Sequence, residues 1–302
     1  MDRFHSMSVF VAVAEEESFA GGARRLNISP PAVTRAVAML EERLGIKLLT
    51  RTTRFVRATD AGLRYLDSVR RILADADEAD ESAAGVHATP RGKLAVTAPV
   101  LFGRMYVMPG IVDYLKQYSD VSISAIFLDR VVNLLEEGLD VGVRIGELPD
   151  STMRAIPVGT VRRVLCASPQ YLKQHRVPKD PHDIAGHTII SASPVSPSIE
   201  WRFGAGKKGV TVKVLPRLTV TNNDAAIQAA LQGFGITRLM SYQVASLLAT
   251  GQLKRILSGW EPPPLPIHVM HLEGRQASAK VRSFVELLVD QLRGNNVLTE
   301  SK

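Results

Sequence analysis

Hydrophobic residues recur at helical spacing in three successive segments at the start of the chain. The segment from Phe4 to Ala14 has apolar residues at intervals of three and four, which predicts an amphipathic helix ending near Glu16. Ser18 is a suitable N-cap for a second helix, because its hydroxyl can accept a hydrogen bond from an unpaired backbone N–H.

A third helix is predicted from Ser29 onward, within the sequence NISPPAV. Ser29 can cap this helix, and Pro30 suits its first turn because the N–H that proline lacks has no partner there. One face is apolar, with Val33, Ala36, Val37, Leu40 and Leu44 at helical intervals. Two helices joined by so tight a turn form a helix-turn-helix.

The opposite face of the third helix carries side chains that suit a DNA groove. From Pro31 to Ala38 the helix rises about 10 Å, which fits a major groove about 12 Å wide. Arg35 can bond to a guanine edge or a phosphate, Thr34 can do likewise, and Pro31 can contact a thymine methyl group. The alternative is an ordinary three-helix unit with an undistinguished surface, and the local charge favours DNA.

Beyond Gly45 the apolar pattern changes to a period of two. KLLTRTTRFVRAT predicts two short strands around a Thr52–Thr53 turn, with Arg51, Arg54 and Arg57 projecting. A hairpin of this kind beside a recognition helix is a wing, which contacts the DNA backbone or the neighbouring minor groove.

A long helix is predicted from Thr59 to about His87. Its apolar seam consists of Leu63, Leu66, Val69, Ile72, Leu73 and the alanines that follow them. Because a lone helix of this length is marginal in water, we expect it to pack against its copy in a homodimer, which would place two DNA-binding heads on two half-sites.

The positive charge is concentrated in this part of the chain. The window from Arg24 to Arg71 has eleven basic and four acidic residues, a net +7 that equals the net charge of the whole chain. This excess is typical of a surface for a polyanion, although a solvated basic face fits charge alone equally well. The predicted partner is double-stranded DNA, with contacts from Arg24, Arg25, Ser29, Pro30, Pro31, Thr34, Arg35, Arg51, Thr52 and Arg54.

Beyond a hinge-like break at residues 88–92, predicted strands and helices alternate. KLAVTAP is a strand, LFGRMYVMPGIVDYLKQY is mostly helix, VSISAIFL is a strand, RVVNLLEEG is a helix ended by Gly138, and DVGVRI is a strand. Such alternation predicts an α/β fold with parallel sheets flanked by helices. An amphipathic helix from Ser278 to Arg293 follows near the end of the chain.

The N-terminal stretch FVAVAEEESFAGGARRLNISPPAVTRAVAMLEERLGIKLLTRTTRFVRATDAG resembles, position for position, the DNA-binding head of LysR-type transcriptional regulators. The order of ARRL, SPPAVTRAV, LEERLG and LLTRTTR makes this resemblance specific. One departure is the pair Gly21 and Gly22, which stands in the second helix where the family usually has alanine or a polar residue. Glycine in that position should weaken the helix.

The regulatory domain of the same family resembles DRVVNLLEEGLDVGVRIGELPDS, VGTVRRVLCASPQYL, ALQGFGI and LPIHVMHLEGRQASAKVRSFVELL. The resemblance implies an all-α winged helix-turn-helix domain, a linker helix for dimerisation, and an α/β regulatory domain of two Rossmann-like lobes, like a periplasmic binding protein. It also implies a homotetramer. The implied ranges are 1–58 for the winged domain, 59–88 for the linker, 89–302 for the regulatory domain, about 91–162 and 266–293 for lobe I, and about 163–265 for lobe II.

In this family the effector lies in the cleft between the two lobes. By resemblance, the effector-binding residues are Ala98, Pro99, Val100, Leu101, Phe102, Asp129, Arg144, Thr221, Asn222 and Asn223. Strand carboxyl ends and helix N-termini offer free N–H groups to an anion. Together with the apolar wall at 100–102, these groups favour a small, partly hydrophobic organic anion as effector.

Three positions leave the effector prediction open. Pro99 stands where the family often has a hydroxyl side chain, so one donor to a carboxylate is missing. Alternation along its strand allows Arg144 to point to the cleft or away from it. Arg238 follows GFGI where the family usually has a Leu-Pro ending; it is either a cation near the cleft or, as we favour, a solvated side chain.

Enzyme motifs are weak in this sequence. Gly204 to Gly209 matches G-x-G-x-x-G but leads into a strand, so a hairpin turn is favoured over a dinucleotide loop. Cys166 lies in the apolar strand VLCAS and is predicted to be a small buried residue, not a nucleophile. We therefore expect neither an enzyme nor a cofactor.

The remaining alternatives are a solute-binding or transport-associated protein with an incidental basic head, and an enzyme with a nucleic-acid anchor. The first would need export or a membrane partner, and the N-terminus lacks the pattern of a signal peptide. Without an apolar run long enough to cross a bilayer, the sequence predicts a cytoplasmic protein with no membrane partner.

Overall fold

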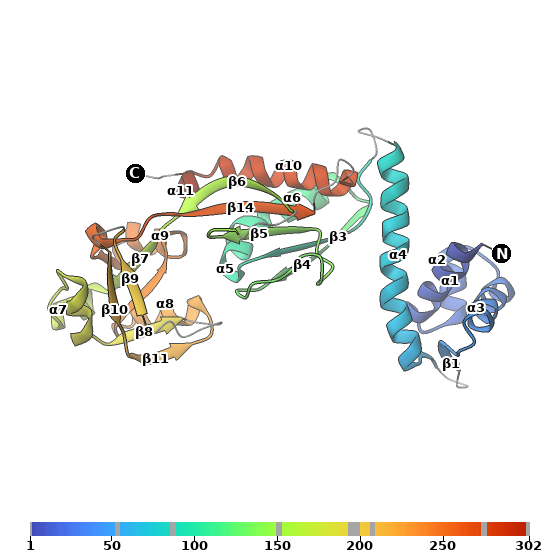
Figure 1. Cartoon of the computed structure of the whole chain (residues 1–302), viewed down its shortest axis with the longest axis horizontal. Coiled ribbons are helices and arrows are strands. Elements are labelled where there is room, and N and C mark those ends of the chain that lie inside the picture. The colour runs from blue at the N-terminus through green and yellow to red at the C-terminus, as the bar shows by residue number, and fades with distance from the viewer. Residues whose placement is uncertain are drawn as a thin grey trace. The chain divides into compact units, whose positions relative to one another are not determined.

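The computed structural model describes residues 2–51, 55–84, 89–148, 153–192, 200–205, 209–272 and 277–299 (Figure 1). Backbone contacts divide the chain into two units, residues 1–88 and 89–302, and each is described by itself. Every helix in the described ranges is too short or too polar to span a bilayer.

Three helices form the core of the first unit: α1 (Arg3–Glu15), α2 (Phe19–Leu26) and α3 (Pro30–Leu44). Ser18 caps α2 as predicted, because its hydroxyl accepts the N–H of Gly21 at 3.1 Å. Phe10 of α1 and Val37 and Leu40 of α3 are buried together in the apolar core of the unit. The predicted helix-turn-helix is therefore confirmed.

Gly22 lies where α2 approaches α1 closely. A Cβ atom at this position would lie 2.8 Å from Cγ2 of Val13 and 3.1 Å from the Val13 backbone nitrogen. The missing side chain lets the two helices approach, which offsets the low helix propensity of glycine.

The wing and the long helix follow. β1 (Leu49–Arg51) and β2 (Val56–Ala58) pair antiparallel, with Thr50 opposite Arg57, and α4 spans Asp60–Ala84. Leu66 and Val69 of α4 are buried in the unit's own core, whereas Leu63 and Ile72 remain exposed. The predicted apolar seam of α4 is therefore divided, and only part of it is available to a second subunit.

Lobe I of the second unit contains a five-stranded sheet in the order β4-β3-β5-β14-β6. β3 is parallel to β4 and β5, as predicted, but β14 is antiparallel to β5 and β6, so the sheet is mixed. Figure 1 shows α10 beside β6 and β14, and α10 also packs on α6. The bounds are β3 Gly92–Ala98, β4 Val121–Phe127, β5 Val141–Ile145, β6 Met153–Val161, β14 Leu265–Leu272, α6 Met108–Gln117, α10 Ala279–Arg293 and α11 Asn296–Thr299.

The helical segment after β3 contains a wider turn. α5 (Val100–Phe102) continues through a π-helical turn, η2 (Gly103–Val107), into α6. Pro109, in the first turn of α6, has no N–H to donate, and its ring conflicts with the carbonyl of Met105 one turn earlier. A π-turn is one of the local adjustments that accommodate such a break in the helical bonds.

The predicted helix RVVNLLEEG is wrong, because residues 131–133 have no regular structure and residues 134–138 form turns. Asn133 Oδ1 accepts the N–H of Leu135 at 3.1 Å, which satisfies the backbone locally. Arg144 donates to the carbonyl of Val132 at 2.7 Å and to that of Arg130 at 3.2 Å. These carbonyls are bonded by a side chain from β5, so tertiary bonds replace the helical ones.

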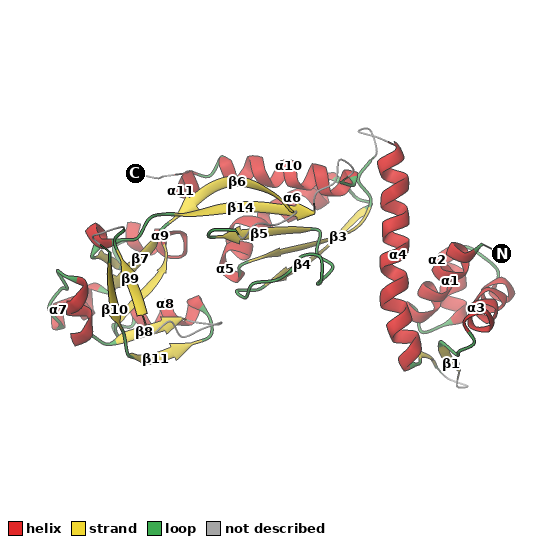
Figure 2. Cartoon of the chain, in the orientation of Figure 1, coloured by secondary structure: helices red, strands yellow, loops and turns green. Residues whose placement is uncertain are grey.

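Lobe II contains a second five-stranded sheet in the order β11-β8-β12-β7-β13, with both parallel and antiparallel pairs (Figure 2). Its strands are β7 Arg163–Ala167, β8 Ile189–Ala192, β11 Pro216–Val220, β12 Ile236–Met240 and β13 Lys254–Ile256. A separate hairpin pairs β9 (Glu200–Phe203) with β10 (Val210–Lys213), which confirms the hairpin predicted around Gly204. The helical segments are α7 Pro169–Gln174, η3 Pro181–Gly186, α8 Asn223–Leu231, α9 Ser241–Ala249 and η5 Ser258–Trp260.

The two faces of the lobe II sheet have different coverings. Leu165 and Ile236 belong to a cluster with Tyr171 of α7 and Trp201 of β9. The opposite face belongs to the larger core cluster, which contains Val164, Cys166 and Leu239 of the sheet together with apolar residues of α8 and α9. We call these the outer face, covered by α7 and the β9–β10 hairpin, and the inner face, covered by α8 and α9.

Cys166 is buried on the inner face, as predicted. Burial raises the pKa of its thiol to about 12, which keeps it protonated and unreactive near neutral pH. No group of three metal-binding side chains occurs among the residues that the structure describes.

Candidate functional site

The outward face of α3 is the first candidate site. Pro31, Thr34 and Arg35 are all exposed on it, one helical turn apart or less. Within the described ranges Arg35 has neither an ion pair nor a hydrogen bond, so its guanidinium group is available to a ligand. The structure therefore brings together the side chains that were predicted to contact base edges.

At the start of α3, side chains rather than free backbone N–H groups are available to bind a ligand. Pro30 and Pro31 have no N–H, and the next two, of Ala32 and Val33, donate to the carbonyl of Ser29 at 2.9 and 3.2 Å. Ser29 occupies the predicted cap position, but the prediction that its side chain caps the helix is wrong, because the described structure contains no such bond. Its exposed hydroxyl is left for an external partner.

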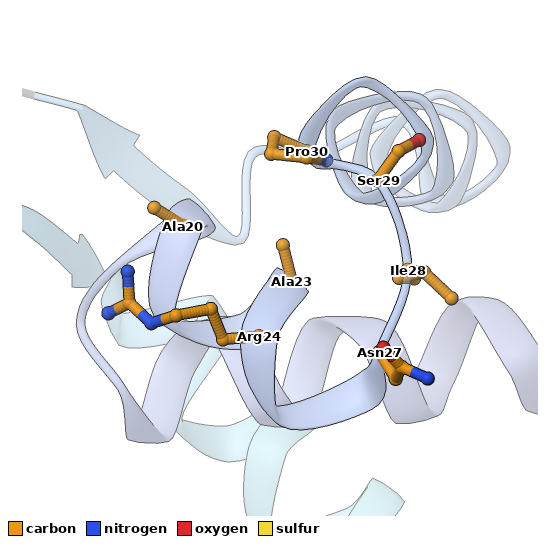
Figure 3. A pocket seen from close by; sticks show the side chains of 7 residues that line it. All are labelled: Ala20, Ala23, Arg24, Asn27, Ile28, Ser29 and Pro30. Atoms are coloured by element: carbon orange, nitrogen blue, oxygen red, sulfur yellow. The ribbon is translucent and has the colours of Figure 1, made fainter.

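An open pocket of about 350 Å³ lies between α2 and the start of α3 (Figure 3). Figure 3 shows Arg24 on one side of it and Ser29 on the other, with the apolar side chain of Ala23 between them. A basic and a hydroxyl side chain around an apolar floor suit the phosphate and sugar of a DNA backbone. The lining residues are Ala20, Ala23, Arg24, Asn27, Ile28, Ser29 and Pro30.

Arg25 is placed differently from Arg24. It forms an ion pair with Glu15 at 2.6 Å, and Arg70 of α4 reaches the same carboxylate at 2.7 Å. Partial burial alone would raise the pKa of Glu15, but the bonds from Arg25 and Arg70 lower it below the ordinary value. Glu15 therefore joins α2 and α4 to α1, and a phosphate would have to compete for Arg25.

Glu41 connects α3 to the wing. Its carboxylate is buried and accepts the backbone N–H groups of Leu48 at 2.9 Å and Leu49 at 3.1 Å, together with Lys47 Nζ at 2.6 Å. The sequence interpretation missed this role, yet Glu41 follows Val37 by four residues and so continues the buried stripe. A carboxylate at such a position signals a buried polar contact.

Thr59, just before α4, forms hydrogen bonds to the chain that leads into the wing. The Thr59 hydroxyl donates to the carbonyl of Lys47 at 2.8 Å and accepts the N–H of Gly62 at 2.9 Å. A Cβ atom on Gly62 would lie 2.0 Å from the Leu48 carbonyl oxygen, so only glycine fits. The recognition helix, the wing and the linker helix therefore meet at Leu48, the residue before β1.

Only some of the wing residues that were predicted to project or to contact DNA lie in the described part of the chain. Arg57 is exposed on β2. Arg51 lies in β1, although its side chain is outside the described structure, and Thr52 and Arg54 fall in the turn outside the described residues. Their predicted DNA contacts remain predictions.

Three of the seven predicted effector residues of lobe I are buried. Ala98, Leu101 and Phe102 have exposed fractions of 0, 3 and 0%, so of the segment 98–102 Pro99 and Val100 reach the surface in part. Asp129 accepts the N–H of Val100 at 3.0 Å. This helix N-terminus therefore already has an anionic partner from the chain itself.

Arg144 and the lobe II residues have structural roles as well. Arg144 donates to the carbonyls of Arg130 and Val132, and partial burial lowers its pKa. Asn222 caps α8 by accepting the N–H of Ala225 at 2.8 Å, and Thr221 beside it is exposed.

An ion pair and an aromatic cluster, both missed by the sequence interpretation, join the lobes near these residues. Arg104 of η2 pairs with Asp224 of α8 at 3.3 Å, and both side chains are exposed. Phe102 contacts Tyr242 of α9 edge to face, with centroids 5.3 Å apart, and Tyr106 lies within 5.8 Å of Tyr242. Only the fold places these residues together, because they are more than a hundred positions apart.

Arg238 corrects another prediction. It was expected to be solvated, but its guanidinium carbon lies 4.9 Å from the centroid of the Trp201 ring, and burial lowers its pKa to about 10. Since Arg238 alternates with Leu239 of the inner face, it belongs to the outer face of lobe II and not to the side of α8.

Two family models match this chain. Residues 4–63 match the bacterial regulatory helix-turn-helix protein, lysR family, and residues 87–293 match the LysR substrate binding domain. Together the two matches include α1 to α3, the wing and both lobes.

Similar proteins have the same organisation. The chain is 32% identical over 283 residues to the HTH-type transcriptional regulator PtxR of Pseudomonas aeruginosa, covering 94% of this chain and 91% of that protein. It is 31% identical over 255 residues to the probable HTH-type transcriptional regulator LtrA of Klebsiella pneumoniae, covering 84% and 82%.

Solved structures agree at the level of the whole chain. CrgA, a LysR-type transcriptional regulator from Neisseria meningitidis, aligns with a TM-score of 0.62 and 29% identity over 96% of this chain and 99% of that chain. The Vibrio cholerae virulence activator AphB shares the fold with a TM-score of 0.62, at 24% identity over 96% and 99%. A solute-binding protein with an incidental basic head does not account for these matches. The chain belongs to the LysR family of DNA-binding transcriptional regulators, with a helix-turn-helix head and an effector-binding substrate domain.

Proposed function

We propose that this regulator inserts α3 into the major groove of its operator. Arg35 and Thr34 contact base edges, while Pro31 contacts a thymine methyl group. The observation that carries the proposal is the exposed Arg35 side chain, which has no partner in the described ranges and lies within a window of net charge +7.

Phosphate contacts come from the pocket beside α3 and from the wing. Arg24 and the Ser29 hydroxyl hold one backbone phosphate, because the prolines at 30 and 31 leave no free amide for it. Arg57 contacts the adjacent backbone or minor groove, with Arg51, Thr52 and Arg54 as further predicted contacts.

The effector binds where the two lobes meet, at Pro99, Val100, Asp129 and the start of α8. Because Asp129 already occupies the N–H of Val100, an organic anion would take Arg104 in place of Asp224. The single exposed contact between Arg104 and Asp224 is exchangeable, since surface ion pairs contribute at most about 1 kcal/mol.

Assembly uses the part of α4 that the head's own core does not cover. Ile72 is exposed, and Ala76 and Ala79 follow it at helical intervals. Small residues beside an exposed isoleucine suit close packing of two copies of α4. The assembly is a homodimer through α4, and two homodimers form the tetramer that the family resemblance implies.

The DNA proposal is tested with an operator that the protein itself selects from random-sequence DNA. Affinity measured by fluorescence anisotropy should fall by tens-fold or more between about 50 and 200 mM salt. Arg35→Ala should weaken binding by about 1–3 kcal/mol and reduce sequence preference. Arg57→Ala should instead weaken binding to all DNA sequences by the same factor. Arg176→Ala, an exposed arginine of lobe II, is the matched control. If Arg35→Ala binds the operator with the affinity and sequence preference of the wild type, the exposed face of α3 is not the recognition surface.

A further inference from the structure

Two arginines on the outer face of lobe II have no counter-ion. Arg163 begins β7 and Arg238 lies in β12, where the antiparallel register sets Arg163 opposite Met240 and Arg238 opposite Leu165. The two arginines are therefore diagonal neighbours on one face of the sheet. In the part of the chain that the structure describes, neither guanidinium group has a hydrogen bond or an ion pair.

Arg238 is partly removed from water, whereas Arg163, at the start of β7, is exposed. Burial lowers the pKa of Arg163, and burial together with the positive charge of Arg163 lowers that of Arg238 to about 10. Arg238 is also held over the Trp201 ring, which is itself 4% exposed. Two adjacent like charges, one of them partly desolvated, are unfavourable unless an anion joins them, and unfavourable charges of this kind cluster at binding sites.

The acidic residues of lobe II are engaged elsewhere. Residues 163–265 contain twelve basic and only five acidic residues. Asp224 pairs with Arg104, Glu261 with Arg255, and Asp180 with His182. Asp183 accepts the N–H groups of Lys179 and Asp180, and Glu200 has an interaction of its own. The counter-ion for the arginine pair therefore has to come from outside the described chain.

The location separates this pair from the effector region. Arg163 and Arg238 share the outer face with Leu165 and Ile236, whereas α8, which carries Asp224, packs on the inner face through Ala226 and Ile227. The sheet of lobe II lies between the two regions.

We propose that Arg163 and Arg238 form a second anion-binding site on the outer face of lobe II, which takes a small oxyanion with two negative charges, either a phosphate monoester or a dicarboxylate. A guanidinium group presents two parallel N–H donors to such an oxyanion, and two adjacent groups match its double charge. Trp201 holds the plane of the Arg238 fork by stacking. The site goes beyond the proposed function, because it requires neither DNA nor a ligand between the lobes.

The test uses the full chain and four probes: glycerol 3-phosphate, succinate, acetate and sodium chloride at matched ionic strength. Calorimetric titration should show saturable binding of glycerol 3-phosphate, succinate or both, and not of acetate. Arg163→Gln and Arg238→Gln should each weaken that binding at least tenfold, whereas Arg202→Gln, an exposed arginine on β9, should not change it. Arg238→Lys keeps the charge but not the fork, so intermediate affinity is expected.

A response to glycerol 3-phosphate alone would assign the site to phosphates, and a response to succinate alone would assign it to dicarboxylates. If no probe binds more than sodium chloride does, the proposal is overturned. It is also overturned if Arg163→Gln and Arg238→Gln retain wild-type affinity while melting at a lower temperature. That result would show that Arg238 only covers Trp201 and stabilises the fold. Circular dichroism of each variant confirms that lost binding is not lost folding.

Discussion

The carboxylate of Glu41 accepts the backbone N–H of Leu48 at 2.9 Å, so a side chain of the recognition helix fixes the chain where the wing begins. The same carboxylate reaches Leu49 and Lys47, and Thr59 holds Lys47 and Leu48 from the side of α4. The spacing between the recognition helix and the wing therefore depends on one buried acid.

Glu41→Gln should destabilise the DNA-binding head. Glutamine keeps the shape but loses the charge-assisted bonds, which contribute about 1.5–3 kcal/mol each in favourable cases, so we expect a loss of about 1–3 kcal/mol in the free energy of unfolding. Urea denaturation of the full chain, followed by far-ultraviolet circular dichroism, measures this loss. Glu42→Gln, on the exposed neighbouring position, is the control and should change little.

The pH dependence of the head follows from the same acid. Burial alone would raise the pKa of Glu41, but the bonds from Lys47, Leu49 and Leu48 lower it below 4.5. A carboxyl whose pKa is lower in the folded state stabilises the fold above its unfolded pKa and loses that effect as pH falls through the folded value. The wild-type head should therefore lose stability below about pH 4.5 more steeply than Glu41→Gln does. If the stability of the wild type and of Glu41→Gln falls with the same slope as the pH is lowered, the role assigned to Glu41 is wrong.

Gly22→Ala should destabilise the packing of α2 on α1, although alanine is the better helix former. The added Cβ would lie 2.8 Å from Cγ2 of Val13, and overpacking of this kind costs about 1–3 kcal/mol. The double variant Val13→Ala with Gly22→Ala should recover part of that loss in thermal melts. A more stable Gly22→Ala would mean that the helices can separate without penalty.

Ile72→Glu should weaken the proposed homodimer, because it places a charge on the exposed apolar position of α4. Leu63→Glu is the matched control: Leu63 is also exposed but lies half a helical turn away around the axis, nine residues before Ile72. Analytical ultracentrifugation at micromolar concentrations should show dissociation for Ile72→Glu and not for Leu63→Glu. The opposite pattern would move the interface to the other side of the helix.

Arg104→Gln should abolish binding of an anionic effector between the lobes, and Asp224→Asn should strengthen it by releasing Arg104. Benzoate and neutral benzamide are suitable probes, since both have an apolar ring and only benzoate is charged. Calorimetry should show binding of benzoate to Asp224→Asn at least as tight as to the wild type. If the protein binds benzamide more tightly than benzoate, and Arg104→Gln does not change this preference, an organic anion is excluded as the class of ligand.

The sequence by itself determined the order of elements in the head and which side chains of α3 are exposed. Subtraction of the apolar stripe of α3 leaves Pro31, Thr34 and Arg35, since a helix that buries one face must expose the other. The alternation of strands and helices likewise determined the α/β class of the second unit, and the period-two pattern determined the wing. These features follow from local periodicity and short-range turn chemistry.

Tertiary structure alone decided the features that depend on distant partners. Residues 131–138 contain a helical pattern but do not form a helix, because Arg144 from β5 bonds to the carbonyls of Arg130 and Val132. Arg238 looked like a solvated cation until β9 placed Trp201 beneath it. Arg104 and Asp224 are 120 residues apart and meet only when the two lobes are assembled. Local pattern determines which face of an element is buried, but the partner that covers that face is brought there by the rest of the chain.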